Sequence, residues 1–214
     1  MKVLVVGANG QIGKQLVEMI HDSKHHEVRA MIRKQEQEAT FREKGIDTVL
    51  ASLEGTVDEI AAAACGCDAI VFTAGSGGHT GLDQTLLIDL DGAAKTVEAS
   101  EKAGIKRFIM VSALQAHNRE NWSEAIKPYY AAKHYADRIL LQSGLNYTII
   151  RPGGLLNETG TGKVKVAENL DRGSIPRSDV AKTIFAALNE ENTFWKSFDL
   201  ISGDVEIKDA LKKL

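Results

Sequence analysis

Near its start the chain reads Val3-Leu4-Val5-Val6-Gly7-Ala8-Asn9-Gly10-Gln11-Ile12-Gly13. Four consecutive branched apolar residues are typical of a strand buried on both faces, as the strands of a parallel sheet are. The glycines that follow lack a Cβ atom, so the chain can turn tightly at Gly7 and a helix can pack closely against the strand at Gly13. The stretch therefore predicts a buried strand, a tight turn and the start of a helix.

The same alternation of short apolar runs and longer amphipathic segments continues along the chain. Runs rich in Val, Ile, Leu and Phe predict strands at Val3–Gly7, Glu27–Arg33, Thr48–Ala51, Asp68–Ala74, Arg107–Ser112, Tyr147–Arg151 and Phe198–Ile201. Segments long enough for crossover helices lie at Gln11–Asp22, Val57–Ala64, Thr85–Ala103, Pro128–Ser143 and Arg177–Leu188. Strands that alternate with helices predict an α/β fold, a doubly wound parallel sheet of the Rossmann type.

The organisation of the chain favours one domain. Neither a repeat nor a Pro- or Ser-rich linker divides the 214 residues. Residues 1–152 carry the regular alternation and form the expected cofactor-binding core. Residues 153–214 begin with a polar, glycine-containing stretch and predict a small substrate lobe followed by the last strand and helix.

The composition narrows the class of protein. The formal net charge is −3 and both signs are interspersed, so neither nucleic acid nor a membrane surface is expected as a partner. No apolar run approaches the roughly 18 residues of a membrane span. Cys65 and Cys67 lack the further ligands of a zinc site, so no metal is expected. We expect a cytoplasmic protein, a monomer or a homodimer, with a small-molecule substrate.

The glycine turn is the first candidate binding site. A Gly-x-x-Gly-x-x-Gly turn between strand and helix lets the backbone approach a pyrophosphate, and the helix N-terminus adds free N–H groups and about half a positive charge. The Gly-Lys-Ser/Thr of a P-loop is absent from the turn. The turn therefore predicts a dinucleotide site made by Gly7, Asn9, Gly10, Gln11, Ile12 and Gly13.

The end of the second predicted strand indicates which dinucleotide is bound. About 20 residues after such a turn, an acidic residue accepts from the 2′-hydroxyl of NAD, whereas an arginine accommodates the 2′-phosphate of NADP. Here the strand ends in Arg33-Lys34 with no acidic residue at its tip. A charge-assisted contact to Arg33 is worth roughly 1.5–3 kcal/mol, so the sequence predicts NADP(H) in preference to NAD(H).

Three further segments resemble the atypical branch of the short-chain dehydrogenase/reductase superfamily, and the resemblance covers essentially the whole chain. They are Asp68–Gly75, Ile105–Ala113 and Tyr147–Gly153. The resemblance includes small bacterial sugar-epimerase-like proteins and NAD(P)-binding oxidoreductases, and it implies a Rossmann fold that binds a nicotinamide cofactor. Asp89 stands where many extended-type members carry Asn.

The resemblance adds candidate cofactor-binding residues outside the glycine turn. It implies that Ala74-Gly75 lies against the adenosine half of the cofactor and that Pro152-Gly153 passes the nicotinamide. Leu53 and Lys133 complete the expected set, Lys133 by holding the nicotinamide ribose.

Tyr129, Lys133 and Ser112 are the candidate catalytic residues. Tyr129 and Lys133 stand four residues apart in a predicted helix, so their side chains share one face. A free phenol has a pKa of about 10 and needs an adjacent cation to exchange protons near neutrality. Ser112, at the end of the fifth strand, is expected to hydrogen-bond the substrate oxygen. Tyr130 is also in register with Lys133, so the alternative tyrosine stays open.

These features predict an NADP-dependent oxidoreductase that moves hydride to or from a small carbonyl or alcohol compound, or that completes an oxidise-and-reduce cycle as an epimerase. Two alternatives remain at this point. One is a non-catalytic NADP(H)-binding redox sensor. The other is a flavin or quinone reductase in which neither tyrosine takes part.

Overall fold

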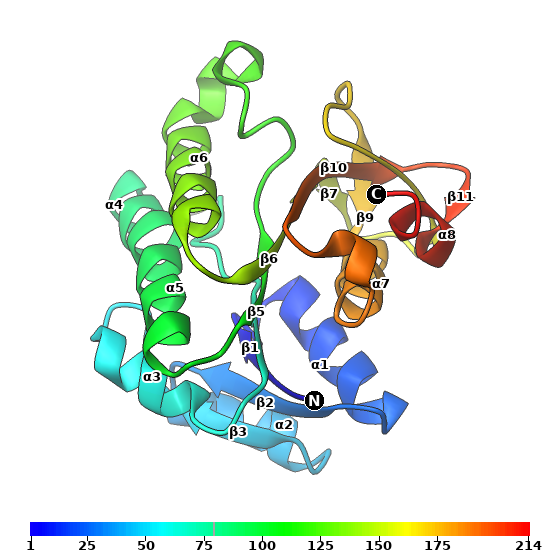
Figure 1. The fold of residues 1–214 in the computed structure, drawn as a ribbon. Helices are drawn as coiled ribbons and strands as arrows, with labels where there is room; N and C mark the ends of the chain where they lie inside the picture. Colours follow the sequence, from blue (N-terminus) through cyan, green and yellow to red (C-terminus); the bar gives the residue numbers. More distant parts are fainter. Residues whose placement is uncertain (79) are drawn as a thin grey trace.

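A central sheet with helices on both faces forms the molecule (Figure 1). The structure is a computed structural model and describes residues 1–78 and 80–214. The strands are β1 (Lys2–Val6), β2 (Glu27–Ile32), β3 (Asp47–Leu50), β4 (Ala69–Phe72), β5 (Arg107–Val111), β6 (Asn146–Pro152), β7 (Gly154–Leu156), β8 (Lys163–Ala167), β9 (Ser174–Pro176), β10 (Lys196–Ser202) and β11 (Val205–Glu206). Among the described residues, nine of them form one sheet in the order β11-β8-β10-β6-β5-β4-β1-β2-β3.

The seven predicted strands correspond to β1 to β6 and β10, and they run parallel to one another. This confirms the predicted doubly wound sheet. The winding direction reverses between β1 and β4, which are neighbours in the sheet. In open sheets of this kind, ligands bind beyond the carboxyl ends of the strands at such a point. The glycine turn follows β1 and therefore lies there.

The helices cover both faces of this sheet. They are α1 (Gln11–Ser23), α2 (Glu38–Arg42), α3 (Val57–Ala64), α4 (Leu82–Gln84), α5 (Gly92–Lys102), α6 (Lys127–Gln142), α7 (Arg177–Ala187) and α8 (Ile207–Leu211), with the π-helix η2 (Thr85–Asp91) and 3₁₀ turns η1 (Gln35–Gln37), η3 (Arg119–Asn121), η4 (Glu124–Ile126) and η5 (Glu191–Thr193). In Figure 1, α1 and α7 pack together on one face, while α3, α5 and α6 cover the other.

Two apolar layers explain why the strands read as continuous apolar runs. Along β1, Val3 and Val5 face the layer beneath α1 and α7, and Leu4 and Val6 face the layer beneath α3, α5 and α6. Because neighbouring side chains of a strand point to opposite faces, a strand covered on both faces must be apolar at every position. All four side chains are fully buried.

Two predicted segments differ from the structure. The predicted helix Thr85–Ala103 is helical in the structure, but its first part, Thr85–Asp91, is a π-helix that continues into α5 at Gly92. The polar stretch after residue 153 also contributes to the main sheet. Its strand β8 pairs antiparallel with β10 and extends the sheet, while β7 and β9 form a separate two-stranded sheet. None of the described helices is both long and apolar enough to span a membrane.

Candidate active site

The glycine turn after β1 presents backbone atoms without covering side chains. Gly7 has φ +83°, and a Cβ atom there would lie 2.6 Å from the backbone nitrogen of Ala74. A Cβ at Gly13 would lie 2.2 Å from the carbonyl oxygen of Gly7. Only glycine fits these two positions, because any side chain would collide with fixed backbone. Asn9, Gly10 and Gln11 are exposed along the turn.

The N-terminus of α1 is free to bind an anion. Gly10 is the N-cap residue, no side chain caps the helix, and its first turn holds no acidic residue. The first N–H groups of the helix therefore have no intrahelical partner, and the helix dipole favours negative charge there. Ile12 is buried beneath the turn and anchors the helix in the core. These residues fit the pyrophosphate of a dinucleotide.

Arg33 and Lys34 leave the end of β2 with exposed side chains. The Gln37 side chain accepts hydrogen bonds from the backbone N–H groups of both residues, at 3.0 Å and 3.3 Å. This contact fixes the backbone of the turn while leaving the two cations in solvent. The arrangement suits a contact to a phosphate group on the adenosine side of a dinucleotide.

Other predicted cofactor residues lie at the same end of the sheet. Ala74 touches the glycine turn at Gly7, and the exposed Gly75 follows it. Leu53 is buried beside Gly92 at the start of α5. On the far side of β5, the Pro152 carbonyl accepts from the Leu114 N–H at 2.9 Å, and the buried Gly153 packs against the carbonyl oxygen of Gly173.

Tyr129 and Lys133 meet on the inner face of α6. The Lys133 ammonium lies 5.7 Å from the centre of the Tyr129 ring and 3.5 Å from the carbonyl oxygen of Val111, at the end of β5. Burial raises the pKa of the Tyr129 phenol above its usual range, and the Lys133 charge opposes that rise only in part. The predicted pair is therefore assembled beside the end of β5.

The two tyrosines face different surroundings. Tyr130 stacks on Trp122, with ring centres 6.0 Å apart and planes inclined by 13°. Its neighbour Tyr129 lies beside Lys133 instead. The structure therefore favours Tyr129 as the partner of the lysine. Tyr130 instead forms an aromatic pair with Trp122.

Asp89 is the main residue of the site whose pairing the sequence did not indicate. Its Oδ1 atom lies 3.0 Å from the Lys133 Nζ atom, and both side chains are almost fully buried, at 1% and 4% exposure. Burial works to lower the pKa of Lys133, but the neighbouring Tyr129 and Asp89 outweigh it and raise that pKa. A lysine and an acid 44 residues apart in sequence offer no local pattern that would reveal such a pair.

Ser112 is buried at the end of β5, where its hydroxyl has no hydrogen-bond partner among the described residues. It lies close to Asp137, one helical turn beyond Lys133, and its hydroxyl favours the ionised form of that carboxyl, which acts to lower the pKa of Asp137. Burial raises the pKa of Asp137, although Arg151 opposes this with a contact of 2.8 Å. An unpaired buried hydroxyl costs free energy unless a ligand or water satisfies it, which suits a substrate contact.

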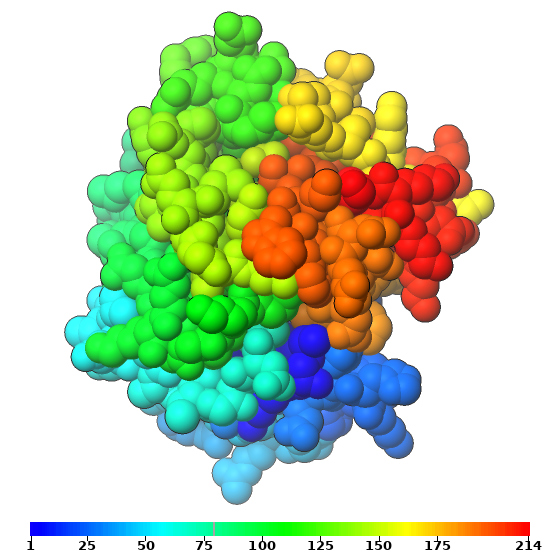
Figure 2. All heavy atoms as spheres, viewed as in Figure 1, coloured from blue at the N-terminus to red at the C-terminus, as the bar shows by residue number. Residues whose placement is uncertain are grey.

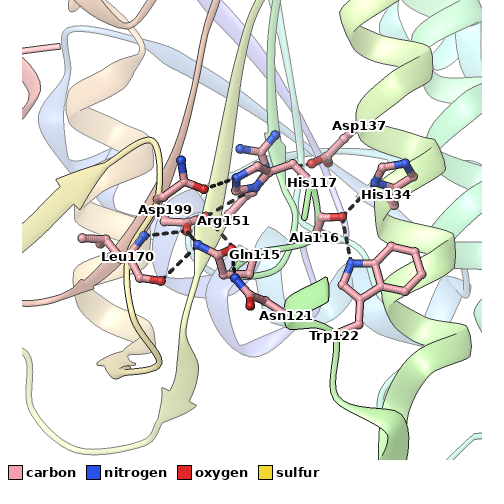
Figure 3. Close-up of polar contacts among 11 residues, drawn as sticks. Gln115, Ala116, His117, Asn121, Trp122, His134, Asp137, Arg151, Leu170 and Asp199 are labelled. Atoms are coloured by element: carbon pink, nitrogen blue, oxygen red, sulfur yellow. Dashed lines mark hydrogen bonds and ion pairs between the residues drawn. The ribbon is translucent and has the colours of Figure 1, made fainter. Parts of the chain in front are cut away.

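A buried polar network holds the segment that follows Ser112 (Figure 3). Gln115 adopts φ +61°, a left-handed conformation that is strained for a side chain. Its backbone N–H donates to Asp199 at 3.2 Å, and its side-chain amide donates to Asp199 at 2.7 Å and to the Leu170 carbonyl at 3.0 Å. Asn121 donates to the Gln115 side-chain oxygen at 2.8 Å. These bonds offset the strain and join the segment to β10 and to residue 170.

A hollow of about 250 Å³ lies beside this network. It is lined by Leu114, Gln115, Glu120, Asn121, Trp122, Tyr130, Leu170, Asp171 and Arg172. The green segment near residue 120 and the yellow segment near residue 170 meet here, as Figure 2 shows. The hollow begins two residues after Ser112 and includes the neighbour of Tyr129, so it is placed to receive a substrate.

Comparison with known proteins shows to which family the chain belongs. Residues 7–191 match the NAD(P)H-binding family. A Bacillus subtilis protein named "Uncharacterized sugar epimerase YhfK" is 66% identical over 214 residues, with 100% of both chains covered. The solved oxidoreductase ylbE of Lactococcus lactis is 33% identical with a TM-score of 0.90, covering 100% of this chain and 96% of that one. The solved structure of ChuY of Escherichia coli O157:H7, an anaerobillin reductase, is 26% identical with a TM-score of 0.84, covering 96% of this chain and 99% of that one.

The fold and the glycine turn define a dinucleotide-binding protein of the oxidoreductase and epimerase class. The chain belongs to the NAD(P)H-binding family.

Proposed function

We propose that this protein is an NADP-dependent oxidoreductase that transfers hydride between NADP(H) and a small carbonyl or alcohol compound. The observation that carries the proposal is the placement of Lys133 beside both Tyr129 and the end of β5, next to the unsatisfied Ser112 hydroxyl. A proton-transfer residue, a cation and a substrate-orienting hydroxyl are the groups that carbonyl reduction requires from a protein.

Each group has a distinct task in this proposal. The nicotinamide supplies or accepts the hydride when it is bound. The glycine turn and the N-terminus of α1 hold the pyrophosphate, and Arg33 holds the 2′-phosphate that distinguishes NADP from NAD. Ser112 orients the substrate oxygen, and Tyr129 exchanges a proton with it. Lys133 supplies the positive charge beside Tyr129 and holds the nicotinamide ribose.

A second candidate function rests on the two aromatic residues that line the hollow, Trp122 and Tyr130. The Trp122 and Tyr130 rings are stacked with nearly parallel planes, and both residues line the hollow. A flat conjugated acceptor such as a quinone or flavin would stack on such a surface and accept hydride without a tyrosine proton. The names of relatives, which include an epimerase and an anaerobillin reductase, are compatible with either kind of acceptor.

Kinetic variants distinguish these functions. NADPH oxidation is followed with carbonyls, sugars, quinones and flavins as acceptors. For a carbonyl acceptor, Tyr129→Phe is expected to lower kcat by roughly 100-fold or more, because general acid–base catalysis contributes about 10²–10⁴-fold. Tyr130→Phe is the matched control and retains most of the rate.

Full turnover by the Tyr129→Phe, Tyr130→Phe double variant would contradict the proton-transfer role. Quinone or flavin turnover that survives in the double variant supports the second candidate function. If the protein binds NADPH but reduces none of these acceptors, the result favours the redox-sensor alternative.

A further inference from the structure

The loop between α3 and β4 holds the two cysteines of the chain. Cys65 directly follows α3, and Cys67 comes two residues later, with Gly66 between them. Both thiols are free, and Cys65 is exposed whereas Cys67 is buried. The loop lies at the amino end of β4, while the glycine turn lies at the carboxyl end of the neighbouring parallel strand β1. The cysteine pair is therefore remote from the cofactor site and takes no part in the proposed function.

A tight turn brings the two cysteines together. Cys65 has φ −55° and ψ 128°, and Gly66 has φ +76°. The Cys67 N–H donates to the Ala64 carbonyl at 3.0 Å. These are the features of a type II β-turn, whose third position needs a positive φ and therefore favours glycine. Two residues of chain span at most about 7 Å and the turn shortens that span, so the Cα separation is compatible with the roughly 4.4–6.8 Å of a disulfide.

Arg29 of β2 fixes this turn and places a positive charge beside both thiols. Its guanidinium donates to the Cys65 carbonyl at 2.8 Å and to the Ala63 carbonyl at 3.2 Å, and it pairs with Asp47 at 2.9 Å. The pKa of Arg29 is raised, chiefly by the hydrogen bond to Asp47 and to a smaller extent by the charges that Cys67 and Cys65 carry as thiolates. Both sulfur atoms therefore lie near the guanidinium. A cation beside a thiol favours the thiolate, which is the form that reacts.

The two thiols differ in their access to solvent. Burial raises the pKa of Cys67, and the positive charges of Arg29 and Lys2 oppose that rise only in part. A buried thiol of this kind reacts slowly with molecules in solution. The exposed Cys65 is reached first, and Cys67 follows it in the same turn. This difference suits an attacking thiol and a resolving thiol, as at cysteines that undergo reversible oxidation.

We propose that Cys65 and Cys67 are a reversible dithiol–disulfide site, in which Cys65 attacks a small disulfide compound and Cys67 completes the exchange. In the first step the Cys65 thiolate forms a bond to one sulfur of the compound, and the other half leaves as a thiolate. In the second step the Cys67 thiolate attacks the Cys65 sulfur, and the second half leaves as a thiolate. The two released thiolates take up the two protons that the cysteines lost. The compound is reduced to two thiols, and the protein gains one disulfide.

Intact-mass spectrometry of the folded full chain tests this inference. The protein is incubated with oxidised glutathione as the probe disulfide, and the remaining thiols are then alkylated with iodoacetamide. The native protein is expected to lose about 2 Da and to take up no iodoacetamide, and dithiothreitol is expected to restore its mass. Cys67→Ser is expected to stop at a mixed disulfide that carries one glutathione on Cys65. Cys65→Ser is expected to react roughly tenfold more slowly or less, because its remaining thiol is buried.

The two serine variants are matched controls, since each changes one atom of one side chain. If a serine variant does not fold, as judged by circular dichroism, the alanine variant is measured in its place. A native protein that stays unmodified, that stops at the mixed disulfide, or that forms a disulfide only between two chains would overturn the inference. A disulfide that forms only in urea would overturn it as well, because the fold would then keep the two sulfur atoms apart.

Discussion

At the scale of single residues, Gly13 shows how tightly the cofactor turn is built. A Cβ atom there would lie 2.2 Å from the Gly7 carbonyl, and backbone cannot move aside as a flexible side chain can. Gly13→Ala is expected to lower the free energy of unfolding by roughly 1–3 kcal/mol through overpacking, and to weaken NADPH binding. Urea denaturation and thermal-shift titration measure the two effects.

Gly144→Ala provides the comparison for this prediction. Nothing lies within 4 Å of a Cβ atom built at Gly144, and its φ is not in the left-handed region. Its unfolding free energy is expected to stay within about 0.5 kcal/mol of the native value. Equal effects of the two substitutions would show that close packing at the turn is not the reason for glycine at position 13.

At the scale of elements, the segment after β5 depends on Asp199 in β10. This buried carboxylate accepts from the backbone and side chain of Gln115 and from the Leu170 N–H at 3.1 Å. Asp199→Ala leaves these donors without their acceptor, at a cost of about 1–3 kcal/mol for each donor that stays dry. Amide hydrogen exchange at Gln115 and Leu170 is expected to accelerate strongly. Asp204→Ala, on the exposed surface nearby, should leave both rates unchanged.

Local sequence patterns predict several elements because one physical cause dominates in each. Four apolar residues and three spaced glycines determine β1, its turn and the start of α1. The strand β8 also has a local signal, the alternation Lys163-Val164-Lys165-Val166, which is typical of a strand with one exposed face. The sequence analysis did not use it. The exposed lysines and the buried Val164 then follow directly from the pairing with β10.

Other features depend on contacts between distant residues, which a sequence pattern does not contain. The π-helix at Thr85–Asp91 has the same apolar spacing as an α-helix, so its extra residue per turn is visible only in the packing against α6. The pairing of Asp89 with Lys133 and of Asp199 with Gln115 likewise depends on tertiary structure. The expected role of Tyr129 is predictable from its spacing to Lys133, but the buried carboxylate that pairs with this lysine is not.

At the scale of the whole molecule, the core continues across residue 152, the predicted boundary between the cofactor-binding core and the substrate lobe. The helix α1 packs against α7, and β6 pairs with β10. Residues 1–152 alone would expose the apolar face of α1 and the edge of β6. We expect this fragment to show no cooperative thermal transition by circular dichroism, in contrast to the full chain. A fragment that melts cooperatively would mean that residues 1–152 form an independent domain.

The central claim is the use of NADP(H), and a thermal-shift titration with NADPH, NADP, NADH and NAD tests it most directly. At 100 times its dissociation constant, a ligand adds about 2.7 kcal/mol of stability, which raises Tm by roughly 5–11 °C in a chain of this size. NADPH and NADP are expected to bind roughly 10- to 100-fold more tightly than NADH and NAD, and Arg33→Ala to remove that difference. Lys213→Ala, at an exposed position near the C-terminus, should preserve it. Equal responses to both kinds of dinucleotide in the native protein, or no response to any of them, would contradict the account.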